Sequence, residues 1–376
     1  MLIFLYILFI VLCLLFSRSK SVFFGGLIFL WLILAGTSGN ADEPVYLSRY
    51  VSPQLWQGQT EVLYGMFMSF CRQLGLDFLG FKMINATLQL VLLAVPIYRR
   101  AKYPNIILAL YSIFPFAMDV TQLRNALATS VMIFSLDYLL RDIDRVDVRA
   151  HILSLNDIKF IVGIIVATGI HTASFFWLLL LVAKKLSIRA TIIFTIAFGL
   201  VSGTIFSPMR LDKLMSIFGA GARMSAYVSA AYTSTKVQML SSALYRVIIF
   251  AAISIIILII LNRYKSVDNN TDIFFAIKCN IIVLCVIPLM IQYTPEMYRM
   301  QIGLAIFNYI VILNSYNIHR SDYLQKDGLS VKNCAITIGL ILLTVSSLYL
   351  LAIWGGNFKV VIVPIFTNNS LVQIFF

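Results

Sequence analysis

Charge is the property that this sequence most clearly lacks. Only 12% of the 376 residues are charged and 60% are hydrophobic, whereas soluble domains carry about 25% charged residues. Acidic residues are the scarcer kind, with 16 Asp and Glu against 29 Lys and Arg, which gives a formal net charge of +13. This composition excludes an ordinary soluble protein. It predicts a single integral membrane domain over residues 1–376, with no separate soluble domain.

Cysteine and histidine are sparse as well, which bears on metal and redox chemistry. The five cysteines form no Cys-x-x-Cys pair and mostly fall in apolar segments, so we interpret them as small buried hydrophobic residues. Of the three histidines, His151 and His319 are predicted to lie on the opposite side of the membrane from His171. The sequence therefore predicts no metal site and no cofactor.

The N-terminal apolar segment lacks the basic residues that precede the apolar core of a secretory signal. Its first charges, Arg18 and Lys20, come after the apolar run 2–16. This order is typical of a helix that stays in the membrane and is not removed.

Long apolar runs fill most of the chain and predict an all-α, polytopic membrane protein. A helix needs about 20 residues to cross the membrane, and we expect about twelve crossings. They are predicted at residues 2–16, 22–38, 78–98, 104–118, 122–140, 158–170, 173–184, 190–206, 241–262, 273–292, 299–318 and 333–355. The pair 158–170 and 173–184 is short, which predicts either a hairpin that does not fully cross or longer helix ends.

Basic residues cluster in alternate connections between these helices, and the alternation predicts their orientation. The clusters are Arg18/Lys20, Arg99/Arg100/Lys102, Arg141/Arg145/Arg149, Lys184/Lys185/Arg189, Arg263/Lys265 and Arg320/Lys326/Lys332. Cytoplasmic loops of membrane proteins carry an excess of Lys and Arg. We therefore predict that these connections are cytoplasmic and that both chain ends lie outside.

Two long connections fall on the predicted outer side, at residues 39–77 and 207–240. Residues 61–76 of the first look like an amphipathic helix that lies at the membrane surface, because the alternation leaves them no crossing of their own. The second is longer than most connections and carries aromatic and Ala/Ser-rich segments. Long loops in compact proteins are usually functional or disordered, and we expect partial helix here.

The stretch 119–134 is the most conspicuous part of the sequence. It begins an apolar helix, yet it contains Asp119 and Arg124. A charge at the centre of a bilayer costs roughly 2.5–3.5 kcal/mol on insertion scales, so such residues usually lie near an interface, form pairs or line a cavity. We interpret this stretch as one wall of a polar site at the outer edge of the membrane.

Further positive residues map to the outer face, against the usual trend. They are Arg124, Arg210, Lys213, Arg223, Lys236, Arg246 and Arg299. Arginine suits phosphate because its planar group donates two parallel hydrogen bonds. Each arginine could instead extend alone to a lipid headgroup. Taken together, Arg124, Arg223, Arg246 and Arg299 favour a site for a lipid-linked pyrophosphate beside an apolar groove.

His171 lies between two apolar helices and is a second candidate point of chemistry. Histidine exchanges a proton readily near neutral pH, so His171 is a candidate general base or hydrogen-bond donor; the alternative is a residue that caps a helix end. Glu296 lies three residues before Arg299 and could form an ion pair with it at a helix start. Asp42 and Glu61 are further acids on the predicted outer face.

Two segments in the first external loop resemble a known family. The family pattern has an Asp followed by a Tyr in this loop, which Asp42 and Tyr46 match. It then has Glu-Pro-Gly-Phe or a similar segment, which Glu61-Val-Leu-Tyr64 matches in part, without the Pro and the Gly.

Two later segments complete the resemblance. An Arg-Gln pair that opens a helix rich in small residues corresponds here to Arg124-Asn125, and a His-Ser-Ala segment between two short helices corresponds to His171-Thr172-Ala173. In this order and at these spacings, the four segments resemble the EpsG-type and Wzy-type polysaccharide polymerases of bacteria. The resemblance covers about residues 37–186, and extends more loosely to 300.

The resemblance implies a glycosyltransferase with a GT-C-like fold in the bacterial cytoplasmic membrane, with its active site facing outside. Such a polymerase moves a glycan from undecaprenyl pyrophosphate to a hydroxyl of the next lipid-linked oligosaccharide repeat unit, without a cofactor and without nucleic acid. Its partners include a chain-length regulator and a flippase. The candidate catalytic residues are His171, Glu296, Asp42 and Glu61. The candidate substrate-binding residues are Arg124, Asn125, Tyr64, Thr172, Arg223, Arg246 and Arg299.

Other functions fit a basic, multi-spanning protein. A flippase or exporter of lipid-linked glycans should carry charge midway through the bilayer, whereas the charge here is predicted on one face. An O-antigen ligase or a membrane acyltransferase also has a histidine and large external loops. The glycan product separates them: loss of a polymerase leaves single repeat units outside, and loss of a flippase leaves none.

Overall fold

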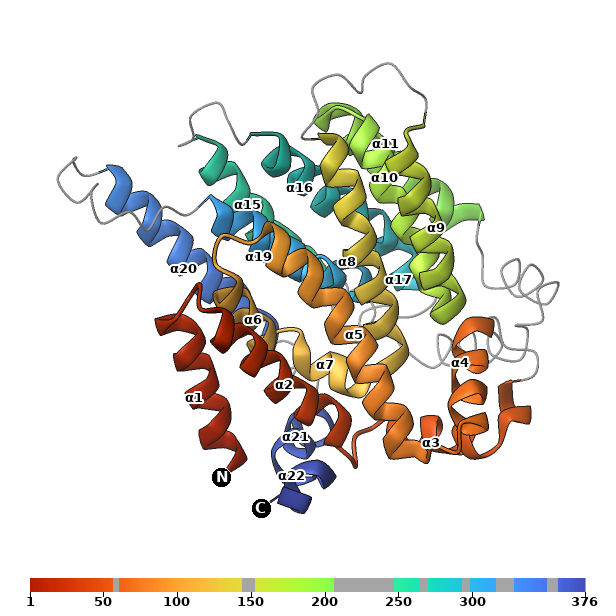
Figure 1. Ribbon diagram of the computed structural model, residues 1–376. Helices are drawn as coiled ribbons and strands as arrows, with labels where there is room; N and C mark the ends of the chain where they lie inside the picture. The colour runs from red at the N-terminus through yellow and green to blue at the C-terminus, as the bar shows by residue number, and fades with distance from the viewer. Residues whose placement is uncertain are drawn as a thin grey trace.

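The computed structural model describes residues 1–56, 61–143, 153–205, 247–263, 270–292, 298–315, 328–349 and 358–375. Over these ranges the chain is helical, and the isolated bridge between Thr37 and Asn369 is the one β-type pairing that they contain. The prediction of an all-α protein is therefore confirmed (Figure 1).

The helices of the N-terminal part are α1 (Leu2–Leu15), α2 (Lys20–Gly36), α3 (Glu43–Val51), η1 (Pro53–Trp56), α4 (Val62–Gln73), α5 (Phe78–Arg100), α6 (Pro104–Ile113), α7 (Phe116–Thr121), α8 (Leu123–Ile143), α9 (Leu155–Ile170), η3 (Thr172–Leu178), α10 (Leu179–Lys185) and α11 (Ile188–Ile205). Those of the C-terminal part are α15 (Ile249–Arg263), α16 (Asn270–Ile282), η6 (Val283–Val286), α17 (Ile287–Gln292), α18 (Arg299–Gly303), α19 (Ala305–Asn314), α20 (Gly328–Tyr349), η10 (Phe358–Ile362), α21 (Val363–Thr367) and α22 (Ser370–Phe375).

Two helical stretches among the described residues are long and apolar enough to cross a membrane, Phe78–Arg100 and Thr271–Ile291. Eight further apolar helices are shorter, at 10–17 residues. These apolar helices agree with a membrane protein. The count of about twelve crossings stays a prediction, because most of the helices fall below the length that a crossing requires.

Several predicted crossings are divided into shorter pieces. The predicted helix 104–118 is interrupted at Pro115, which has no N–H to donate to the preceding turn and lies at the N-cap of α7. The predicted helix 299–318 is divided between α18 and α19 at Leu304. Such interruptions create helix ends inside the bundle, where backbone groups and side chains can face a site.

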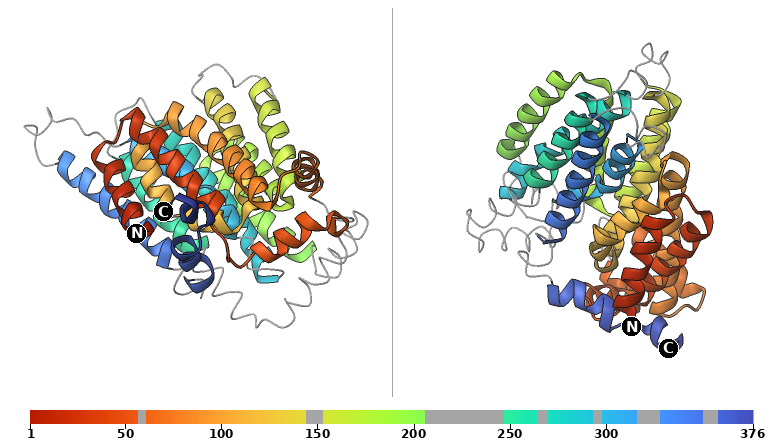
Figure 2. Two further views of the ribbon diagram at one scale, coloured as in Figure 1. Left: turned by 60° about the horizontal axis from the view of Figure 1, so that its bottom comes forward. Right: turned by 90° about the vertical axis from the view of Figure 1, so that its left-hand side faces the viewer.

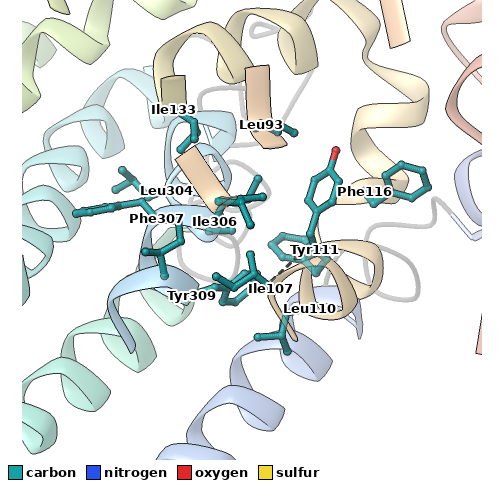
Figure 3. Packing of buried hydrophobic residues seen from close by; sticks show 14 of the residues in the cluster. Leu93, Ile107, Leu110, Tyr111, Phe116, Ile133, Leu304, Ile306, Phe307 and Tyr309 are labelled. Carbon is teal, nitrogen blue, oxygen red and sulfur yellow. Dashed lines mark hydrogen bonds between the residues drawn. The ribbon is translucent and has the colours of Figure 1, made fainter. Parts of the chain in front are cut away.

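Helix α8 is the centre of the N-terminal part and packs along α9 and α5 (Figure 1). Its contact with α9 is so close that a Cβ atom added to Gly163 would lie 1.9 Å from the Oγ atom of Ser135. Small residues at such positions let membrane helices approach each other. Around this centre, buried apolar side chains from α5, α6, α7, α8 and α19 pack into one core (Figure 3).

One end of the bundle gathers described residues that belong to, or flank, four of the predicted cytoplasmic connections. The Arg18 guanidinium lies 4.8 Å from the centre of the Tyr103 ring, and Lys184 donates hydrogen bonds to Asp142 at 2.8 Å and Asp157 at 2.5 Å. Arg100 forms an ion pair with Asp137 near the C-terminal end of α8. The described residues of these four connections therefore lie close to one another, as alternation requires.

The opposite end gathers predicted outer connections. Lys82, near the start of α5, donates hydrogen bonds to the Thr37 carbonyl at 2.8 Å and to Glu43 at 3.0 Å. Both chain termini lie at this end, and α22 packs on α2 (Figures 1 and 2). The helix α4 occupies most of the predicted amphipathic segment 61–76, and its buried residues Tyr64, Met68 and Cys71 share one face.

Topology can be tested with cysteine or reporter tags. Tags at 45 and 225 are expected outside, and tags at 101, 145 and 265 in the cytoplasm, because the basic connections alternate. Positions 145, 225 and 265 lie outside the described residues. The same side for 145 and 225 would overturn both the orientation and the outer location of the candidate site.

Candidate functional site

A buried carboxylate, Glu61, lies between Arg124 and His171. The Nδ1 atom of His171 is 2.8 Å from Oε1 of Glu61, and Arg124 forms an ion pair with Oε2 through its Nη1 atom. The Glu61 side chain is 1% exposed and the side chains of its two partners are 12% and 11% exposed. One carboxylate therefore joins two residues that are 63 and 110 positions away in the sequence.

Three helix ends bring these residues together. Glu61 directly precedes α4, Arg124 lies in the first turn of α8, and His171 follows the last residue of α9. The α4 and α9 helices meet so closely that a Cβ atom added to Gly169 would lie 2.6 Å from the side chain of Leu63. A larger residue at 169 would separate His171 from Glu61.

Tyr46 from α3 supports Arg124 on its other side. Its ring centre lies 5.4 Å from the Arg124 guanidinium, and its hydroxyl accepts from the Arg124 backbone N–H at 3.4 Å. Tyr64 packs edge to face against Tyr46, with ring centres 6.3 Å apart, and is fully buried. A cation above an aromatic face is attracted by the ring electrons, so Tyr46 holds the arginine in one position.

A cavity of about 140 Å³ opens beside this group. Its lining residues are Asp42, Val45, Tyr46, Gln122, Arg124, Asn125, His171 and Arg299. Pockets that enclose a drug-sized ligand measure roughly 300–1,000 Å³. This cavity is smaller and cationic, so it suits one charged group such as a phosphate, with the remainder of a large ligand outside it.

Arg299 reaches the cavity from the C-terminal part of the chain. It begins α18, which approaches η3 so closely that a Cβ atom on Gly303 would lie 2.5 Å from the ring of Trp177. Two residues further along, Gln301 donates to Asn280 at 2.9 Å, and Asn280 exchanges hydrogen bonds with Asn308 at 2.8 and 3.0 Å. These buried amides connect α18 to α16 and α19 and thereby position Arg299.

His171 is set up as a neutral imidazole in the connection after α9. Burial lowers its pKa below the usual 6.5, and the positive Arg299 and Arg124 act in the same direction, which outweighs the opposing effect of Glu61. Because Glu61 forms an ion pair with Arg124, its Oε1 serves as the acceptor at Nδ1. The proton of the neutral ring therefore lies on Nδ1, which leaves Nε2 as a hydrogen-bond and proton acceptor.

The structure brings together five of the residues named as candidates from the sequence, Asp42, Arg124, Asn125, His171 and Arg299, around one cavity. Glu61 lies behind His171. The other two described candidates lie beside these residues: Thr172 follows His171 at the start of η3, and Tyr64 is buried against Tyr46. Glu296, Arg223 and Arg246 lie outside the described residues.

Other residues of this region were not among those candidates. Gln122 lines the cavity, although it lies only two positions before Arg124 in the conspicuous stretch 119–134. The buried amides Asn280, Gln301 and Asn308 lie in apolar segments, where each polar side chain needs a partner. Isolated amides within apolar helices are the signal that could have identified them.

Among the described residues, no group of three or more His, Cys, Asp or Glu side chains is placed to hold a metal ion. The comparison with protein-family models matches the EpsG family over residues 21–358. Neither the curated proteins nor the solved structures contain a match.

Proposed function

This protein belongs to the EpsG family, and we propose that it joins undecaprenyl-pyrophosphate-linked oligosaccharide repeat units at the outer face of the bacterial cytoplasmic membrane. Membership of this family indicates a polysaccharide polymerase-type role. The lipid donor, the acceptor, the outer location and an association with a chain-length regulator and a flippase belong to the proposal.

One observation carries the proposal, the placement of His171 between a buried carboxylate and a cationic cavity. A glycosyl transfer from a lipid pyrophosphate needs a base for the acceptor hydroxyl and cations for the leaving phosphate. His171 and its partner Glu61 meet the first need. Arg124 and Arg299, which line the same cavity, meet the second.

In the proposed reaction, Nε2 of His171 accepts the proton of the acceptor hydroxyl. The hydroxyl oxygen forms a bond to the anomeric carbon of the donor glycan, and the bond from that carbon to the pyrophosphate oxygen breaks. The bonding electron pair leaves with the lipid pyrophosphate, whose negative charge Arg299 and Arg124 stabilise. Glu61 holds the Nδ1 proton and favours the imidazolium that forms, as the carboxylate does in an Asp-His pair.

The two other candidate acids have different places in this scheme. Glu61 is buried behind the imidazole, so we assign it to orientation of His171 and not to direct proton removal. Asp42 lines the cavity itself and is the alternative base. Variants of His171 and Asp42 distinguish the two, because the true base is the one whose loss abolishes transfer while the protein remains folded.

Replacement of Arg124 by lysine is expected to lower polymerisation at least tenfold while the amount of protein in the membrane is unchanged. Lysine keeps the positive charge, but it lacks the planar group that contacts Glu61 and can also bind a phosphate. The measurement is the chain-length distribution of the glycan on gels. Arg72→Lys, on the exposed face of α4, is the matched control, and normal chains from Arg124→Lys would remove Arg124 from the site.

Gel patterns from a deletion strain separate the proposed polymerase from the other functions. We expect single repeat units to reach the outside in the deletion strain, and restoration of long chains by the wild-type protein. A flippase would leave no units outside. A ligase would leave long chains on the lipid carrier, so both patterns contradict the proposal.

A further inference from the structure

A second, larger cavity lies at the other end of α8 from the candidate site. Its volume is about 380 Å³, and it is formed by the C-terminal ends of α5 and α8, one face of α19 and the start of α16. Arg141 borders this cavity and Arg124 borders the first, which places them about 25 Å apart along α8 at 1.5 Å per residue. The two cavities are therefore separate sites near opposite faces of the molecule.

The rim of this cavity is positively charged and rigid. Asp137 is shared by two arginines: Arg100 forms an ion pair with Oδ1, and Arg141 donates to Oδ2 at 2.8 and 3.0 Å. Asn314 donates to the Arg100 carbonyl at 2.7 Å. The side chain of Arg99 is exposed, and among the described residues no hydrogen bond or ion pair joins that side chain to another residue. The lining contains three arginines and two acidic residues, Asp137 and Asp272, so it carries an excess of positive charge.

The floor of the cavity has the opposite character. It is lined by Leu140, Phe307, Ile310 and Val311, which are only 2–6% exposed. A free inorganic anion gains nothing from such a floor, whereas a molecule with an anionic head and a hydrocarbon chain can contact both parts. Burial of hydrocarbon contributes about 0.8 kcal/mol per CH₂ group. The combination favours an amphiphilic anion.

We propose that this cavity binds an anionic phospholipid of the membrane, one whose headgroup carries a phosphate and a net negative charge. The phosphate contacts Arg99 and Arg141 at the rim, and the first part of the hydrocarbon chain lies against Phe307 and Val311. Arginine pairs well with phosphate oxygens, and basic pockets between helices on the cytoplasmic side of membrane proteins bind acidic lipid headgroups. This inference is independent of the proposed polymerase activity, because it uses none of the residues of the outer site.

The test uses the full-length protein in detergent and native mass spectrometry with added dioleoyl phosphatidylglycerol or dioleoyl phosphatidylcholine. The wild type is expected to retain phosphatidylglycerol preferentially. The variant Arg99→Gln/Arg141→Gln is expected to lose about 30-fold in its affinity for phosphatidylglycerol, which is about fivefold for each removed arginine. Arg100 is left in place so that Asp137 keeps one partner.

The matched control is Lys20→Gln/Arg189→Gln, which removes the same charge from exposed positions outside the cavity. It should bind the lipid as the wild type does. Equal losses in the two double variants would overturn the proposal, because they would indicate attraction to the basic surface as a whole.

A second variant separates a lipid from free phosphate. Ile310→Phe adds volume to the apolar floor and leaves the arginines intact. It is expected to weaken phosphatidylglycerol binding several-fold, and thermal unfolding in detergent is measured beside it to show that the variant is folded. Unchanged lipid binding by this variant, or displacement of the lipid by millimolar inorganic phosphate, would overturn the assignment to a lipid.

Discussion

Replacement of His171 by glutamine is expected to lower the rate of polymerisation by about 10²–10⁴-fold, the usual contribution of a general base. Glutamine can still form a hydrogen bond with Glu61, but it cannot accept a proton. The rate is measured with purified protein and lipid-linked repeat units, next to the amount of membrane-inserted protein. Because glutamine keeps the hydrogen bond, the protein is expected to insert normally.

The comparison with His171→Ala decides which role the imidazole has. If His171 transfers a proton, both variants insert and neither polymerises. If it only forms a hydrogen bond, the glutamine variant keeps much of the activity. Normal polymerisation by His171→Ala would place the base elsewhere, with Asp42 in the cavity as the next candidate. His151→Gln, at the predicted cytoplasmic side, is the matched control and should be fully active.

The pH dependence of the rate gives an independent measurement of the same role. The pKa of His171 lies below 6.5, mainly because the side chain is buried. A base acts only when it is unprotonated, so the rate is expected to be constant at neutral pH and to fall as the pH drops through this lowered pKa. The residual activity of His171→Gln should lack this decrease on the acid side.

Replacement of Glu61 by glutamine is expected to have the largest effect on stability, about 3–5 kcal/mol, because it leaves the charge of Arg124 buried without its carboxylate. The Arg124 side chain is only 12% exposed. Polymerisation should be lost as well, since the imidazole loses the carboxylate that holds its Nδ1 proton. The measurements are thermal unfolding in detergent and the rate of polymerisation.

The double variant Glu61→Gln/Arg124→Gln separates stability from chemistry. Removal of both charges eliminates the unpaired cation, so the double variant should be more stable than Glu61→Gln while it remains inactive. A double variant that is no more stable than the single variant would show that the ion pair does not determine the effect. Recovery of activity in the double variant would contradict the assigned roles of both residues.

The fold class could be predicted from the sequence because it depends on composition and local pattern. The apolar content of 60% and the long apolar runs predict helices in a membrane, and the alternation of basic connections predicts which connections share an end. The structure places Arg18 beside Tyr103 and Lys184 beside Asp142 and Asp157, as that alternation requires. The lengths of the helices were less predictable: the interruption at Pro115 has a cause that the sequence contains, whereas the one at Leu304 follows Gly303, whose close contact with Trp177 only the tertiary structure shows.

The residue types of the candidate site were also visible in the sequence, because charges and a histidine are conspicuous within apolar segments. Their partners were not. From the sequence, Glu61, Asp42 and Glu296 were equivalent acids, and Arg124 could have extended alone to a lipid headgroup. The structure pairs Arg124 and His171 with the same carboxylate, that of Glu61, and places Asp42 in the lining of the cavity.

The sequence by itself thus indicated a helical membrane protein and the kinds of side chain available for chemistry. Each of these depends on composition or on residues close together in the chain. Only the tertiary structure decided which carboxylate orients the histidine, that Arg299 joins Arg124, and that an apolar floor lies beneath the arginines at the opposite end. These depend on contacts between helices distant in sequence. Glu61 and His171 are 110 residues apart, and they meet because glycines such as Gly169 let their helices approach closely.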